Sequence, residues 1–389
     1  MHINPALAAT EAAPVVEAKK WIEGRVFPAE RPLINVFQAA PVASPPEALR
    51  RVIADAALNL PEAHLYGPVL GLGPLREELA AQWSQAYGGQ IAAKNVAITQ
   101  GCNQAFAATM ATLAGAGDEV LIPSPWYFNH KMWLDMSGVR TVPVPCGEDL
   151  IPDIDAARDL ITDKTRAIAL VSPNNPTGVE YPADVIRGFY DLAKSSGIAL
   201  VLDETYRDFD SRDDSPHDLF ADPDWDATLI HLYSFSKAFR LTGHRVGALI
   251  TSPERMLEVE KFLDTVAICP AQLGQYAALW GLQNLGDWVA GERDEILARR
   301  HAMGEVIADI DGWRVRGLGA YFAYVEHPGG QAGDVARRLI DDAHVLCLPG
   351  TFFAPKGDPL GEGCLRFAFA NIDRDGITEL GHRLAGLAP

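Results

Sequence analysis

The sequence predicts an α/β fold, in which a large domain has a mostly parallel, seven-stranded sheet between layers of helices and a smaller α+β domain follows. Three observations predict it. Short apolar runs alternate with helix-like segments through the middle of the chain, which is typical of parallel sheets covered by helices. Several runs are apolar throughout, as strands buried on both faces require. After about residue 270 the alternation stops.

Seven short apolar runs are the candidate strands of the large sheet: 95–100, 119–124, 140–145, 166–172, 198–204, 228–234 and 246–252. Between them, residues 103–114 and 182–197 are typical of helices. The second of these segments begins with Pro182 and ends with Gly197, which commonly start and end helices. We therefore expect parallel strands with helices on both faces of the sheet.

The C-terminal part of the chain has a different pattern. Residues 271–310 predict a long helix with a break near Gly286, and the segments after it predict strands at 321–326, 344–350 and 364–370, with helices near 332–342 and at the end. We expect three parts: an N-terminal arm that packs on the smaller domain, the large domain and the smaller domain, over residues 1–45, 46–280 and 281–389.

The composition is that of a globular protein. Hydrophobic residues make up 48% and charged residues 22% of the 389 residues. A net charge of −18 argues against general binding of nucleic acid or anionic lipid, and no apolar run is long enough to span a membrane. The five cysteines are scattered and the N-terminus does not resemble a signal peptide, so we expect a cytoplasmic protein without a metal site.

Four of the predicted strands run into polar or glycine-rich sequence, namely "GCNQ", "SPNNPTG", "DETY" and "SFSK". Each segment alone also fits a simpler role, as a helix start, a turn, a strand cap or a surface lysine. Ligands of parallel sheets bind outside the carboxyl ends of the strands. The four segments together therefore predict one shared crevice.

Several of these residues suit a phosphate group. The helix that is predicted to start beside Gly101 presents free N–H groups and the positive end of its dipole. Ser234 and Ser236 add hydroxyl donors, and Arg245 adds a guanidinium.

Lys237 and Asp203 complete a recognisable set of groups. In a cationic, partly desolvated site the pKa of Lys237 would fall, which favours the neutral, nucleophilic amine. Asp203, at the end of an apolar strand, would need a cationic partner or strong hydrogen bonds. A phosphate site, a nucleophilic amine and a buried carboxylate are what pyridoxal 5'-phosphate requires, because the carboxylate keeps the ring nitrogen protonated.

The motifs "SPNNPTG", "DETY", "SFSKAFRLTGHRVG" and "CLRFAFA" occur in an order and at separations that resemble the class I/II aminotransferases, pyridoxal-phosphate enzymes of fold type I that include aspartate aminotransferase. The resemblance runs from about residue 30 to the end. It implies a homodimeric enzyme that moves an amino group between an L-amino acid and a 2-oxo acid by ping-pong chemistry. Lys237 would form the Schiff base with the cofactor and shuttle the proton.

The resemblance also implies roles for the residues around the cofactor ring. Asp203 would pair with the pyridine nitrogen, and Asn175 and Tyr206 would hydrogen-bond the phenolate oxygen. Tyr127, in preference to Trp126, would stack on the ring.

Further roles concern the phosphate and the substrate. The phosphate would be held by the N–H groups of Gly101, Cys102 and Asn103 and by Ser234, Ser236 and Arg245. Tyr66 would reach a phosphate across the dimer interface. Arg366 would grip the substrate α-carboxylate bidentately, beside Asn175. Ala39 stands where the family has a glycine whose backbone contacts the same carboxylate.

Other readings of the sequence remain. A pyridoxal-phosphate-dependent C–S (β) lyase on the same fold is the main alternative, and a non-catalytic regulatory module is a remote one. Residues 234–237 also fit the S-x-x-K signature of serine acyl-transferring enzymes, but neither S-D-N nor K-T-G occurs. Arg240 and His244 depart from the family pattern; Arg240 would face solvent or recognise an acidic group on a substrate or neighbouring subunit. Side-chain specificity stays open.

Overall fold

The computed structural model describes residues 2–386. Its large sheet has seven strands in the order β2-β8-β7-β6-β5-β3-β4, with bounds β2 (Val96–Thr99), β3 (Glu119–Pro123), β4 (Arg140–Val144), β5 (Thr165–Val171), β6 (Ala199–Asp203), β7 (Leu229–Ser234) and β8 (Gly247–Ile250). Strand β8 runs antiparallel to both of its neighbours, and the other pairs are parallel. The mostly parallel, seven-stranded sheet predicted from the sequence is confirmed.

Helices cover both faces of this sheet, as the uniformly apolar strands predict. In β6, Leu200 and Leu202 belong to the core on one face, and Val201 belongs to the core on the other. The helices of the large domain are α3 (Glu47–Asn59), α4 (Gly73–Tyr87), α5 (Cys102–Leu113), α6 (Phe128–Met136), α7 (Ile154–Leu160), α8 (Ala183–Ser196), α9 (Trp225–Thr228), α10 (Phe235–Ala238), α11 (Pro253–Ala267) and α12 (Gln272–Asn284). The sequence did not predict α3 and α4.

The smaller domain has a four-stranded antiparallel sheet, ordered β12-β13-β10-β9. Its elements are α13 (Gly286–Ala308), β9 (Arg314–Gly319), β10 (Phe322–Glu326), α14 (Ala332–Arg338), β11 (Val345–Leu346), β12 (Leu348–Pro349), α15 (Pro359–Gly363), β13 (Cys364–Phe367) and α16 (Arg374–Ala385). The predicted long helix is broken at Leu285, next to Gly286. Strand β9 was missed because its sequence, "RVRGLG", is not an apolar run.

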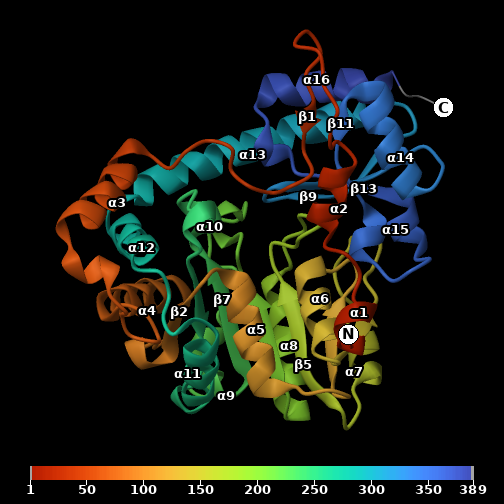
Figure 1. Cartoon of the computed structure of the whole chain (residues 1–389). Coiled ribbons are helices and arrows are strands. Elements are labelled where there is room, and N and C mark those ends of the chain that lie inside the picture. Colours follow the sequence, from red (N-terminus) through yellow and green to blue (C-terminus); the bar gives the residue numbers. More distant parts are fainter. Residues whose placement is uncertain (1, 387–389) are drawn as a thin grey trace.

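The N-terminal arm touches both domains. It contains α1 (Pro5–Ala9), α2 (Pro14–Lys20) and β1 (Ile34–Asn35). In Figure 1 the red segment passes from α1, near α6, to β1, which pairs in parallel with β11 of the smaller domain. The domain boundaries predicted at residues 45 and 280 stay predictions. Residue 1 of the predicted arm and residues 387–389 of the predicted smaller domain lie outside the described residues. No helix within residues 2–386 is both long and apolar enough to cross a membrane.

Candidate active site

A cavity of about 460 Å³ opens where several strands of the large sheet end and the smaller domain begins. The described residues that line it are Ala13, Val15, Gln38, Ala39, Ala40, Cys102, Asn103, Tyr127, Phe128, Asn129, Val171, Asn175, Asp203, Thr205, Tyr206, Ser234, Ser236, Lys237, Thr242, Arg245 and Arg366. The polar segments that follow β2, β5, β6 and β7 therefore meet in one place, as in other parallel sheets. The arm and the smaller domain close the remaining sides.

One end of the cavity is built for an anion. Gly101 caps α5 with φ +81°, and a Cβ there would overlap the guanidinium of Arg245. A Cβ at Gly247 would lie 2.7 Å from the backbone nitrogen of Cys102. These two glycines let Arg245 and β8 approach the start of α5, whose first N–H groups have no partner within the helix. Arg245 Nη1 lies 3.4 Å from Ser236 Oγ, so cationic and N–H donors gather around this end.

Asp203 is a buried carboxylate that stays ionised. Its Oδ1 accepts a hydrogen bond from the Thr205 backbone N–H over 3.0 Å, and its Oδ2 lies 3.2 Å from His130 Nε2. The His130 ring stacks on Phe106 at a centroid distance of 3.7 Å. Burial alone would raise the pKa of Asp203, but His130 and Thr205 outweigh it and hold that pKa below its usual value. Sequence reasoning missed His130, a histidine three residues after Tyr127 in an otherwise unremarked helix.

Lys237 lies in α10 between Phe235 and Phe239, both of which are buried. Its Nζ donates a hydrogen bond to the Ala39 carbonyl and lies 5.6 Å from the centre of the Tyr206 ring. Burial, with the positive charges of Arg366 and Arg245, lowers the pKa of Lys237 to about 7. The amine is therefore available as a nucleophile near neutral pH.

Arg366, on β13, is almost fully buried, with 2% of its surface exposed. Its Nη1 donates to Asn175 Oδ1 over 2.9 Å and its Nη2 donates to the Phe37 carbonyl, while Nε has no partner among residues 2–386. The guanidinium lies over the rings of Phe322 and Phe353, at 5.0 and 4.8 Å. Burial lowers the pKa of Arg366 to about 10, so it remains charged and has a free donor for an anion.

Two tyrosines flank the middle of the cavity. Tyr127 donates a hydrogen bond to Asn103 Oδ1 over 3.2 Å, and its ring meets the His130 ring edge-on at 5.0 Å. The Tyr206 ring packs edge-on against Phe322 at 5.1 Å. These contacts hold both aromatic rings, and Tyr127 and Tyr206 line the cavity.

Comparison with known proteins decides the family. Residues 34–384 match the family model for aminotransferase class I and II. The chain belongs to this family. It is accordingly a pyridoxal-phosphate-dependent enzyme that catalyses transamination, and the aminotransferase fold accounts for its seven-stranded sheet and its smaller antiparallel sheet.

Similar proteins cover most of the chain. The aspartate aminotransferase of Pyrococcus abyssi is 30% identical over 82% of each chain. The probable aspartate aminotransferase of Methanocaldococcus jannaschii is 29% identical over 84% of this chain and 86% of the relative. Among solved structures, the N-succinyldiaminopimelate aminotransferase of Mycobacterium tuberculosis has a TM-score of 0.89 and 26% identity, with both chains fully covered.

The residues of the aminotransferase fit its cofactor. The guanidinium of Arg245 lies so close to the start of α5 that a Cβ at Gly101 would overlap it, and these cationic and N–H donors together suit a phosphate. Ionised Asp203 suits a protonated ring nitrogen, and the Lys237 amine, with its lowered pKa, suits a covalent bond. The buried Nε of Arg366 leaves one donor for a substrate anion.

Four of the residues singled out from the sequence lie outside the cavity lining, namely Gly101, Tyr66, Arg240 and His244. Tyr66 is 80% exposed in the single chain. Arg240 does not face open solvent: it forms an ion pair with Glu292 of its own chain, and its Nη1 donates to the Ser44 carbonyl over 3.3 Å. His244 lies in the turn before Arg245 and does not line the cavity.

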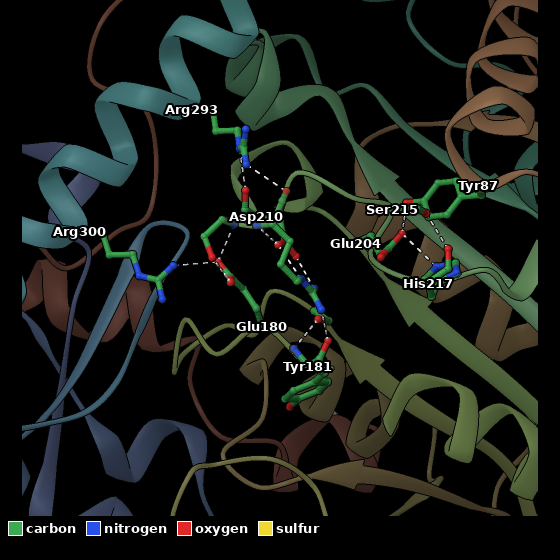
Figure 2. Close-up of polar contacts among 12 residues, drawn as sticks. Tyr87, Glu180, Tyr181, Glu204, Asp210, Ser215, His217, Arg293 and Arg300 are labelled. Carbon is green, nitrogen blue, oxygen red and sulfur yellow. Dashed lines mark hydrogen bonds and ion pairs between the residues drawn. The ribbon is translucent and has the colours of Figure 1, made fainter. Parts of the chain in front are cut away.

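Sequence reasoning also missed a buried polar cluster next to the site, formed by Glu204, Tyr87, His217 and His231. Glu204 accepts a hydrogen bond from Tyr87 Oη, and its Oε2 lies 2.7 Å from His231 Nε2 and 3.4 Å from His217 Nε2. Burial would raise the pKa of Glu204, but the two imidazoles hold it well below its usual value. Figure 2 shows Tyr87 and His217 beside Glu204, the residue that directly follows Asp203.

The loop that follows β6 is held to α13 by hydrogen bonds. Arg293 Nε donates to the Asp210 carbonyl over 2.7 Å, and Arg300 Nη1 donates to Glu180 Oε1 over 3.1 Å (Figure 2). The side chain of Glu180 also accepts the Ser211 backbone N–H over 2.9 Å. The cluster around Glu204 and these arginines thus hold the chain on both sides of Thr205 and Tyr206.

Proposed function

We propose that Lys237 is the residue of this aminotransferase that bonds covalently to the cofactor and moves the proton at the substrate Cα. The observation that carries the proposal is one cavity in which the half-buried Lys237 amine, with a pKa lowered to about 7, faces the groups around Asp203 and Arg366. Pyridoxal phosphate, when bound, supplies the electron sink for breaking the Cα–H bond. A ping-pong cycle then moves the amino group between an L-amino acid and a 2-oxo acid.

The other lining residues would hold and orient the cofactor. Asp203 would keep the ring nitrogen protonated, supported by His130 and Thr205. Asn175 and Tyr206 would hydrogen-bond the phenolate oxygen, and Tyr127 would stack on the ring. The phosphate would lie at the start of α5, where the supporting donors are Gly101, Cys102, Asn103, Ser234, Ser236 and Arg245.

Arg366 would bind the α-carboxylate of the substrate. Its planar guanidinium matches a carboxylate bidentately, and one of its donors has no partner among residues 2–386. Asn175, which accepts from Arg366, would keep the guanidinium in place and contribute to the same contact. Ala39, whose carbonyl accepts from Lys237, lines the cavity beside them and would contact the substrate through its backbone.

We also infer a cytoplasmic homodimer in which Tyr66 reaches the phosphate of the neighbouring subunit. The support is an exposed apolar patch, in which Leu65, Tyr66 and Ile268 are 66%, 80% and 44% exposed. The two segments that carry these residues are linked, because the Gly67 N–H donates to Cys269 Sγ over 3.4 Å. Unpaired cysteines support a reducing compartment. Sedimentation should give a dimer, and Tyr66→Phe should weaken cofactor binding; a monomer with full cofactor affinity would contradict the inference.

The reaction itself is tested by product analysis. Enzyme loaded with cofactor is incubated with an amino acid and a 2-oxo acid, and the new amino acid and new oxo acid are quantified. Equal amounts of the two products are expected, with none from Lys237→Ala. Release of ammonia and pyruvate when no 2-oxo acid is added would instead indicate a C–S lyase and overturn the proposal.

A further inference from the structure

The cavity has a part that neither the cofactor nor the substrate carboxylate needs. Once the proposed roles are assigned, the lining that remains near the arm and the start of α6 consists of Ala13, Val15, Gln38, Ala40, Phe128 and Asn129. These side chains are apolar or neutral. This part of the lining is therefore left to receive the side chain of the amino acid.

The cations of the cavity already have partners or roles. Among the described lining residues, the cationic side chains are Lys237, Arg245 and Arg366, which serve the covalent bond, the phosphate and the α-carboxylate. A second substrate carboxylate placed here would be desolvated without a counter-charge from the described lining residues of this chain, which is strongly unfavourable.

The nearest lysine of α6 does not change this balance. Lys131 forms an ion pair with Asp135 one turn later and borders a neighbouring cavity rather than this one. Glu11, two residues before Ala13, lines the same neighbouring cavity as Lys131. Neither residue supplies a counter-charge for an acidic substrate side chain in this cavity.

We propose that the amino donor carries an uncharged side chain and that Val15 and Asn129 determine this specificity. Val15, on α2, is half-buried and presents an apolar surface to the cavity. The side chain of Asn129 makes no hydrogen bond with the rest of the described chain, so its amide is free to bind a neutral polar group. Donors such as leucine, methionine, phenylalanine and glutamine fit this chemistry, and aspartate and glutamate do not. The inference rests on the proposed function.

The test uses the cofactor-loaded enzyme in single-turnover half-reactions. The absorbance of the cofactor gives a rate constant and a dissociation constant for each donor, without any 2-oxo acid. For each donor, the rate constant is divided by the dissociation constant. This ratio should be at least about a hundredfold higher for the best neutral donor than for aspartate or glutamate, because a site without a matching group discriminates on about this scale.

A matched pair of variants places the effect at Val15. Val15→Lys should raise the ratio of acidic to neutral donors by about tenfold or more, because it adds a counter-charge inside the cavity. Val16→Lys changes the next residue, which is 54% exposed, and should leave the ratio unchanged.

The failures are distinguishable. Wild-type preference for aspartate or glutamate overturns the inference and shows that another group, such as one from the partner subunit, supplies the cation; amino transfer would still stand. An enzyme that holds the cofactor on Lys237 but reacts with no amino acid overturns the proposed function, and the inference about the donor falls with it. Equal shifts in Val15→Lys and Val16→Lys would remove Val15 from the determinants.

Discussion

Arg366 Nη1 donates a hydrogen bond to Asn175 Oδ1 over 2.9 Å, although 191 residues separate the two in the chain. Arg366 belongs to β13 of the smaller domain, and Asn175 follows β5 of the large sheet. The group proposed to bind the substrate carboxylate is therefore fixed by a group proposed to bind the cofactor. If Arg366 binds the substrate as proposed, substrate recognition depends on how the seven-stranded and four-stranded sheets are joined.

Arg366→Ala should weaken amino-acid binding, because it removes a desolvated, bidentate charge pair worth roughly 2–5 kcal/mol. Arg366→Lys should recover only part of the loss, since a lysine cannot match both carboxylate oxygens. Steady-state kinetics should show the main change in KM. Arg316→Lys, at a partly exposed arginine of β9 paired with Glu326, is the control. An unchanged KM in Arg366→Ala would assign the carboxylate to another residue.

Covalent loading of the cofactor should follow the titration of Lys237. Burial and the nearby charges of Arg366 and Arg245 lower the pKa of this amine to about 7, so the neutral form predominates above that pH. The rate at which the apoenzyme captures pyridoxal phosphate, followed by absorbance, should rise from pH 6 and level off near pH 8. A rate that keeps rising with pH up to about 10, as for an ordinary lysine, would be incompatible with the lowered pKa.

Gly101→Ala should weaken cofactor binding through Arg245. The added methyl would overlap the guanidinium and displace a charge-assisted contact of about 1.5–3 kcal/mol. Gly117→Ala is a matched control, because Gly117 also has a positive φ, +93°, but nothing lies within 4 Å of its added Cβ. Both variants should lose similar thermal stability from backbone strain of about 1–2 kcal/mol. Only Gly101→Ala should raise the dissociation constant of the cofactor; equal constants would remove Arg245 from the phosphate site.

Glu204→Gln should destabilise the fold by about 1–3 kcal/mol, because it replaces a buried carboxylate that accepts a hydrogen bond from Tyr87 and contacts His231, whose pKa burial lowers. The pKa of Glu204 is held well below its usual value, so its stabilisation is present above the unfolded-state pKa of about 4.3 and is lost as pH falls toward the folded-state pKa. Urea unfolding should therefore show a larger difference from wild type at pH 7 than at pH 4.

Glu258→Gln is the matched surface control for this prediction. Glu258 is exposed and pairs with Lys261 one turn away on α11, so its removal should change the free energy of unfolding by less than about 1 kcal/mol. If Glu204→Gln is as stable as Glu258→Gln at pH 7, the buried cluster does not stabilise the fold in the way proposed here.

The strands of the large sheet could be predicted from the sequence because each is buried on both faces and contains almost only apolar residues. Asp203 could be singled out because it ends such a strand and lies in a motif. Strand β9 could not, since its apolar residues, Val315 and Leu318, are separated by arginine and glycine and the strand is paired with β10. Local sequence thus reveals elements whose burial is uniform and misses those that depend on a neighbour.

The partners of the site residues were also beyond prediction. His130 and Asp203 are brought together only by the packing of α6 on the sheet. Glu204 and Tyr87 lie 117 residues apart, and nothing in either segment indicates the other. Arg240 has its partner on α13, so its own segment gave no reason to expect an ion pair within the chain.

The most direct test of the central claim is to find the atom that holds the cofactor. Enzyme loaded with pyridoxal phosphate is reduced with borohydride, digested and analysed by mass spectrometry. The mass of the reduced cofactor is expected on Lys237 alone, with loss of the cofactor absorbance, and on no residue of Lys237→Ala. A stoichiometric label on another lysine, or active enzyme without any label, would contradict the account.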